Sequence, residues 1–309
     1  MQHVPYVGSG PYCYANSFAM MFADAAPSPA VIEFSTSSPF GLQLIGGSLP
    51  FFDPYGWDPE AGFEDALAAL GWTSQVSTGD DAEDALSRLR SALKDGPVWV
   101  GPLEMGHLRH QPGMTGPIEA DHYVVVLALD AKRVLMHDPQ GYPYAALPIG
   151  DFMAAWSAKT LTYGEPFTMR SSFSRVAEVS EVDAIQASIP AAIHWLSMVT
   201  DRPMPPGSLG NAEAAEALAA RIEQGCDKGL RAHLVHFAVR VGARRAADAA
   251  TCLKRIGFAK SAAVAGEQAQ LIGALQYPLV LRRDAEAAEA LRRLAPTYNR
   301  LLFALRGGD

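Results

Sequence analysis

The first 178 residues contain two patterns of hydrophobic and polar positions. Before Pro97, apolar side chains recur every three or four positions, as in Phe63, Leu67 and Leu70, which predicts helices. After Pro97, short continuous apolar runs predict buried strands. The predicted helices are 14–25, 60–71, 81–95 and 150–156, and the predicted strands are 97–103, 122–130, 133–139 and 165–170. Helices followed by neighbouring strands are typical of an α+β domain with an antiparallel sheet.

Residues 179–309 follow the helical period almost throughout. Leu291, Leu294, Leu301 and Leu305 illustrate the apolar face that each of these segments presents. The predicted helices are 181–199, 211–224, 227–241, 244–257, 260–276 and 284–305, with breaks at 203–207, Gly225, Gly242 and Pro278. We therefore expect an α+β domain over residues 1–178 and a helical bundle domain over residues 179–309.

Composition narrows the class of protein. The 309 residues are 49% hydrophobic, which suits a globular chain and not a disordered one. A net charge of −8 argues against nucleic acid as the partner. No apolar run has the length of a membrane span, and the first residues do not resemble a signal peptide, so we expect no membrane association. Three cysteines are too few for a disulfide framework, which favours a cytoplasmic protein.

Charge is unevenly distributed between the two expected domains. Residues 1–180 contain 9 Lys and Arg against 20 Asp and Glu, whereas residues 181–309 contain 16 against 13. The basic residues of the second half are Arg231, Arg240, Arg244, Arg245, Arg282, Arg283, Arg292 and Arg293, among others. They are either ordinary solvated helix faces or a docking surface for an acidic protein partner.

Cys13 is the first candidate catalytic residue. It lies in the segment GSGPYCYANSFAMM (8–21), where Gly10 and Pro11 precede a predicted helix. A helix N-terminus offers unpaired backbone N–H groups and a partial positive charge, and both favour a thiolate. The same N–H groups can stabilise an oxyanion. The alternative is that Cys13 is a small buried hydrophobic residue.

His122 and Asp138 are the second and third candidates. His122 begins one predicted strand, and Asp138 ends the strand that pairs with it in a hairpin. An imidazole beside a carboxylate is the arrangement that a thiol nucleophile requires: a base, held by an orienting group. Taken separately, His122 is equally compatible with a structural histidine, and the Asp138-Pro139 pair with a turn.

The three residues together resemble the papain-like cysteine enzymes, and more closely the C39-like peptidases and their non-proteolytic relatives. In that group the nucleophile precedes a central helix, a run similar to HYVVV…DP…G supplies the histidine and aspartate, and a helix similar to GDFMAAW (150–156) follows. The resemblance covers about residues 5–170. It implies that Cys13 is the nucleophile, His122 the general base and acid, and Asp138 the orienting group. The glutamine that papain-like peptidases place shortly before the cysteine is missing, because Gln2 lies too far upstream, and this favours thioesters over peptides as substrates.

Two non-proteolytic relatives fit this expectation. SSPFGLQLIGG (37–47) is similar to a stretch of the butirosin-type acyltransferases. The segment GPYCYANS and the helical extension 181–309 look more similar to the stand-alone cysteine-dependent Dieckmann cyclases of tetramate and pyridone biosynthesis. The resemblance implies that Cys13 accepts a β-ketoacyl-aminoacyl chain from a carrier protein and that ring closure releases it. The alternatives are a carrier-dependent acyltransferase, a peptidase or thioesterase, and a non-catalytic binding module.

The remaining motifs are assigned no chemistry. We expect no cofactor and no metal, because His107, His110 and His137 lack a cysteine or carboxylate at ligand spacing. The loop 105–117, which contains two of these histidines, could gate the site. Asn16 either lines the site or packs, and Trp156 is expected in the core. Aromatic residues that could exclude water are Tyr6, Tyr12, Tyr14, Phe51, Phe52, Tyr55 and Trp57, although core packing explains each of them equally well.

Overall fold

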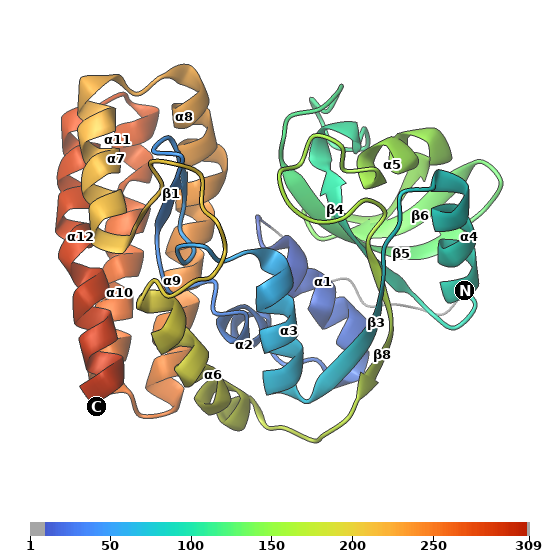
Figure 1. Ribbon diagram of the computed structural model, residues 1–309, viewed down its shortest axis with the longest axis horizontal. Helices are drawn as coiled ribbons and strands as arrows, with labels where there is room; N and C mark the ends of the chain where they lie inside the picture. The colour runs from blue at the N-terminus through green and yellow to red at the C-terminus, as the bar shows by residue number, and fades with distance from the viewer. Residues whose placement is uncertain (1–9, 308–309) are drawn as a thin grey trace. The chain divides into compact units, whose positions relative to one another are not determined.

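The computed structural model describes residues 10–307 and divides them into two compact units (Figure 1). The sheet unit contains the described residues up to Pro29 together with Gly71–Glu178. The helical unit contains Ala30–Leu70 together with the described residues from Val179 onward. Helices beside an antiparallel sheet, followed by a helical region, confirm the predicted α+β class.

A six-stranded antiparallel sheet forms the centre of the sheet unit. Its strand order is β3-β8-β4-β5-β6-β7. The strands are β3 (Trp72–Ser77), β4 (Val98–Glu104), β5 (Asp121–Leu129), β6 (Arg133–Asp138), β7 (Tyr142–Pro148) and β8 (Met169–Arg175). The sequence analysis missed β3 and β7, because most of their side chains are partly or fully exposed and neither strand shows an apolar run.

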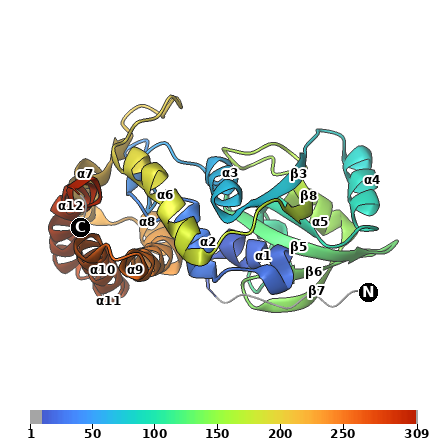
Figure 2. The ribbon, with the colours of Figure 1, turned by 90° about the horizontal axis from the view of Figure 1, so that it is seen from below.

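Helices cover both faces of this sheet. On one face, α1 (Cys13–Phe22) runs beside β5 (Figure 2) and packs Phe18 against Trp99, with 4.4 Å between ring centroids. On the other face, α4 (Ala82–Ala92) and α5 (Ile149–Trp156) bury apolar side chains against strand residues such as Val100 and Val124. Alternate residues of β4 therefore serve opposite faces, as the two-residue period of a strand requires.

The helical unit is built from long packed helices, of which α7, α9, α10 and α12 stand side by side in Figure 1. Its helices are α2 (Pro29–Ser35), α3 (Pro59–Leu70), α6 (Glu181–Leu196), α7 (Asn211–Gly225), α8 (Lys228–His233), α9 (Val239–Arg255), α10 (Ala259–Ala274), α11 (Gln276–Val280) and α12 (Asp284–Gly307). A small sheet of β1 (Gln43–Ile45), β2 (Leu49–Phe51) and β9 (Leu209–Gly210) joins them.

The unit boundaries differ from a single division after residue 178, because Ala30–Leu70 packs with the C-terminal helices. Its strand β1 pairs with β9, and Asn211 both donates its backbone N–H to Leu42 O (2.7 Å) and accepts from Leu42 N (3.3 Å). The Arg245 guanidinium binds Glu33 Oε1 at 2.7 Å and Asp53 Oδ2 at 3.3 Å. Partners this distant in sequence cannot be recognised from local periodicity.

The predicted break at Gly242 is wrong. The chain remains helical from α8 through a π-helical turn, Leu234–Ala238, into α9. Gly242 is required there for packing, since a Cβ atom at this position would lie 2.5 Å from the Phe52 ring. None of the helices among residues 10–307 is long and apolar enough to cross a membrane.

The buried Arg245 cluster predicts the consequence of losing one charge. Burial raises the pKa of Glu33 to about 8, so Glu33 is mostly protonated at neutral pH and its Oε1 accepts a hydrogen bond from the guanidinium. We expect Arg245→Met to lower the free energy of unfolding by about 1–3 kcal/mol, because buried oxygens of Glu33, Phe52 and Asp53 lose their hydrogen-bond donor. Urea unfolding measures this change.

The control is Arg240→Met, at an exposed position of the same helix, for which we expect a change within about 0.5 kcal/mol. Equal effects of the two substitutions would contradict the assignment.

Candidate active site

Cys13 is the first residue of α1, as expected from the sequence. Its side chain is half-buried, and the residues that follow it anchor the helix by burying Tyr14, Ala15 and Phe18. Tyr12, at the N-cap position, makes no side-chain capping hydrogen bond. Backbone N–H groups in the first turn of a helix point toward its N-terminal end, which is the end at which Cys13 lies.

The pairing of β5 with β6 brings His122 and Asp138 together. Val125 pairs with His137, which places Asp138 diagonally across from His122 on the neighbouring strand. His122 Nε2 and Asp138 Oδ1 are 2.8 Å apart, and both side chains are essentially inaccessible to solvent. The two side chains therefore meet across the diagonal of this strand pair.

Cys13 belongs to the surroundings of the same imidazole, because it contributes to raising the pKa of His122. Nε2 is engaged with Asp138, whereas Nδ1 is buried and makes no hydrogen bond within the described residues, so we infer that Nδ1 is the ring nitrogen available to the thiol. The three residues selected from the sequence thus influence one another through His122.

The electrostatics of the site favour a charged pair. Burial alone would lower the pKa of His122, but the charge and hydrogen bond of Asp138, together with Cys13, raise it to about 10. Burial alone would raise the pKa of Asp138, but His122, His110 and the backbone N–H of Gln140 hold it far below its usual range. An imidazolium beside a cysteine stabilises the thiolate, which is the reactive form.

Two residues that the sequence analysis did not assign to the site also bind Asp138. His110 Nε2 lies 2.7 Å and Gln111 Nε2 lies 2.6 Å from Asp138 Oδ2. His110 had been considered only as a metal ligand or as part of a gating loop. The loop that carries both residues has no periodic pattern, so no sequence signal identifies their target.

The other candidate residues have different surroundings. His137 accepts a hydrogen bond from Tyr144 N at its Nδ1, and Trp156 lies in the core, where its Nε1 donates to Thr168 O. Asn16 is buried, and its Nδ2 has no hydrogen-bond partner within the described residues. Among residues 10–307 no group of three or more His, Cys, Asp or Glu side chains could hold a metal ion.

The proposed water-excluding aromatic residues are divided between the units. Tyr12 and Tyr14 flank Cys13 in the sheet unit, whereas Phe51, Phe52, Tyr55 and Trp57 belong to the helical unit. Tyr6 and Gln2 lie outside the described residues.

Most of the arginines considered for docking are paired within the helical unit. Arg245 is buried, so a role for it in an exposed docking face is wrong. The ion pairs of the other arginines are Arg231–Asp284, Arg244–Asp248, Arg283–Glu286 and Arg292–Glu223. Arg240, Arg282 and Arg293 remain exposed.

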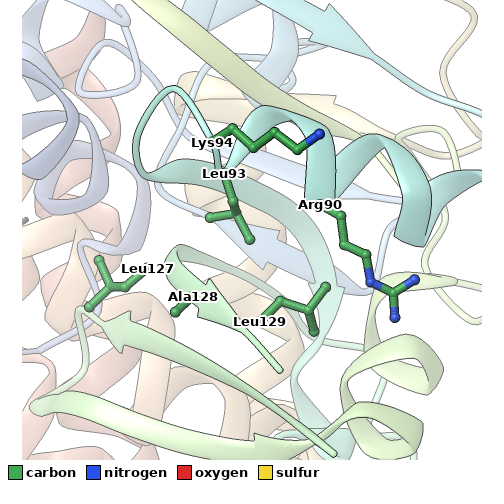
Figure 3. Close-up of a pocket in the computed structure, with 6 residues that line it drawn as sticks. All are labelled: Arg90, Leu93, Lys94, Leu127, Ala128 and Leu129. Atoms are coloured by element: carbon green, nitrogen blue, oxygen red, sulfur yellow. The ribbon is translucent and has the colours of Figure 1, made fainter. Parts of the chain in front are cut away.

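A hollow of about 230 Å³ lies between α4 and the end of β5 (Figure 3). Arg90, Leu93 and Lys94 line it from the helix side, and Leu127–Leu129 line it from the strand. These strand residues lie at the opposite end of β5 from His122, so the hollow is separate from the Cys13 site.

The described contacts connect Cys13, His122 and Asp138 within an α+β unit. Comparison with known proteins finds a family described as the YobF C-terminal domain, which matches residues 205–306, within the helical unit. The chain is also 32% identical over 161 residues to the uncharacterized protein YobF of Bacillus subtilis (strain 168), covering 51% of this chain and 52% of that protein. The chain thus spans about half the length of this curated relative, and neither name states a reaction.

The buried pair predicts a pH-dependent contribution to stability. The pKa of His122 rises from an ordinary 6.5 to about 10 on folding, so its contribution is complete below about pH 6.5 and is lost as the pH rises through 10. The lowered pKa of Asp138 makes its contribution complete above its ordinary 3.8. We expect Asp138→Asn to lower the free energy of unfolding by about 3–5 kcal/mol between pH 4 and 6.5, and by less toward pH 10.

Urea unfolding at several pH values checks this expectation. Asp80→Asn, at an exposed position of the same unit, serves as the control and should change little at any pH. A loss for Asp138→Asn that is equal at pH 5 and pH 10 would contradict the charged pair.

Proposed function

We propose that this protein is a cysteine-dependent acyl-transfer enzyme with a papain-like catalytic unit, and that it closes the ring of a carrier-bound β-ketoacyl-aminoacyl thioester as a Dieckmann cyclase. One observation carries the proposal: His122 interacts with Cys13, at the start of α1, while Asp138 Oδ1 lies 2.8 Å from His122 Nε2. These residues can supply a nucleophile, a base and an orienting group in the order that covalent catalysis needs.

The buried charges favour catalysis over a purely structural role. Moving a carboxylate and an imidazolium out of water costs several kcal/mol per ion, and apolar residues of similar size often stabilise a protein equally well. The His122–Asp138 pair is buried, but its neighbour Cys13 is a half-buried thiol and not a further core residue. A charged pair that ends at an accessible nucleophile is typical of a reactive site.

The first half-reaction loads the acyl chain onto Cys13. The thiolate attacks the thioester carbonyl, and a new C–S bond forms while backbone N–H groups of the first turn of α1 support the oxyanion. The bond to the carrier sulfur then breaks, and His122 gives its proton to the departing thiolate. His122 is left neutral and remains oriented by Asp138.

The second half-reaction forms the ring. Neutral His122 removes a proton from the acidic carbon between two carbonyl groups of the loaded chain. The resulting enolate attacks the acyl carbon on Cys13, a C–C bond forms, and the C–S bond breaks. The product leaves as a cyclic tetramate or pyridone, and the thiolate–imidazolium pair is restored.

A thioester suits this site better than a peptide. Residues 10–12, directly before Cys13, contain no glutamine that could add a side-chain donor for the oxyanion. Expelling an amine makes a strong demand on oxyanion stabilisation, whereas a thiolate is a good leaving group. The substrate class that we propose is therefore a thioester, delivered by an acidic acyl or peptidyl carrier protein to exposed cations such as Arg240, Arg282 and Arg293.

Product analysis with a synthetic β-ketoacyl-aminoacyl thioester tests the function. We expect the protein to yield a cyclic product, and Cys13→Ala to reduce the rate by about a thousandfold or more, because the covalent route is lost. Cys226→Ala is the matched control at the other half-buried thiol and should leave the rate unchanged. A free acid or an amide as the product would contradict cyclisation, and full turnover by Cys13→Ala would contradict the nucleophile.

A further inference from the structure

We propose that His110 and Gln111 are positioning residues of the Cys13 site: they fix the second oxygen of Asp138 so that the first oxygen remains committed to His122. Only the expected effect of these two residues on turnover rests on the proposed acyl-transfer function. Their positioning role rests on their hydrogen bonds to Asp138.

The Asp138 carboxylate receives four hydrogen bonds, two at each oxygen. Oδ1 lies 2.8 Å from His122 Nε2 and 2.8 Å from the backbone N of Gln140. Oδ2 lies 2.7 Å from His110 Nε2 and 2.6 Å from Gln111 Nε2. Rotation of the carboxylate about its Cβ–Cγ bond would break all four, and hydrogen bonds to a buried ionised group are the stronger kind. Asp138 is therefore locked as an anion of fixed orientation.

His110 reaches Asp138 with one ring nitrogen. Its Nδ1 is buried and has no hydrogen-bond partner within the described residues, and its ring stands edge-on to Tyr142 at 5.3 Å. Its contact with Asp138 is therefore made through Nε2 alone.

The loop that carries these residues is fastened at its base by Glu104. This buried carboxylate accepts hydrogen bonds from Gly106 N (3.1 Å), Ile118 N (2.9 Å) and Glu119 N (3.1 Å). Burial alone would raise the pKa of Glu104, but these donors and the Thr160 hydroxyl hold it below its usual value.

The two sides of the loop also touch each other. A Cβ atom at Gly106 would lie 1.9 Å from Gly116 O. The segment Met105–Ala120 is closed as well by a hydrogen bond from Met105 N to Ala120 O (2.8 Å). These contacts hold the segment Met105–Ala120 closed at its base, and we call this segment the clamp loop.

Removal of either donor should affect the thiol at a distance. The titratable groups that face His122 are Cys13 from α1, Asp138 from β6 and Asp121 from its own strand. His110 and Gln111 touch only Asp138 in this set, so their influence on Cys13 must pass through the carboxylate and the imidazole.

The test is the rate of Cys13 alkylation by iodoacetamide between pH 5 and 9, read by peptide mass so that Cys226 and Cys252 do not interfere. Gln111→Met and His110→Phe keep size and remove the hydrogen-bond donor. We expect a roughly tenfold slower alkylation at pH 6 and a shift of the profile to higher pH, as expected from the loss of one charge-assisted bond. His110→Gln restores a donor and should return the rate toward that of the unmodified protein.

His107→Gln, in the same loop, is the control and should leave the profile unchanged. Profiles of Gln111→Met and His110→Phe that superimpose on the unmodified one would overturn the proposal, as would failure of His110→Gln to restore the rate. If one variant does not fold, the other variant provides the test.

The two proposals can fail separately. A shifted alkylation profile in a protein that makes no cyclic product would support the positioning role and reject the cyclase function. Formation of the cyclic product with unchanged alkylation profiles would support the cyclase function and reject the positioning role.

Discussion

The buried carboxylate of Asp138 is the group on which the site depends. It lies at the end of β6, where no solvent reaches it, and it is held by His122, His110, Gln111 and the backbone N–H of Gln140. A buried anion is tolerated only when it is paired and hydrogen-bonded. Strand pairing brings His122 to this carboxylate, and the clamp loop Met105–Ala120 brings His110 and Gln111. Reactivity at Cys13, in our proposal, is the consequence of this arrangement.

The helical unit also contains buried acidic residues that need a partner. Arg245 on α9 binds Glu33 and Asp53, which come from the segment Ala30–Leu70 about two hundred positions earlier. This buried pairing, together with the β1–β9 ladder, makes the early segment an integral part of the helical unit. The family match over residues 205–306 therefore covers only part of this compact unit.

The sequence predicts the elements whose pattern is local. The helix that begins near Cys13, the apolar strands β4 to β6 and most of the C-terminal helices follow from periodicity alone. Cys13, His122 and Asp138 each lie at the end of such an element, and they were selected together because their pattern resembles that of the papain-like cysteine enzymes.

What the sequence does not reveal depends on contacts between distant positions. His110 and Gln111 lie in an aperiodic loop, and their role is visible only when Asp138 is placed beside them. From the sequence alone, Arg245 is interpreted as a surface charge, because its partners Glu33 and Asp53 are distant in sequence. Gly242 is interpreted as a helix break, because the sequence does not show that the Phe52 ring packs against it. In each case the decisive partner is supplied by tertiary packing.

The protonation state of His122 at neutral pH tests the central claim most directly. Nitrogen NMR of the ring distinguishes an imidazolium, with hydrogen on both Nδ1 and Nε2, from a neutral imidazole. With Asp138 ionised and Cys13 as a thiolate, both nitrogens of His122 should carry hydrogen at pH 7, and Asp138→Asn should convert the ring to the neutral form. A neutral His122 ring in the unmodified protein at pH 7 would contradict the charged pair on which the proposed chemistry depends.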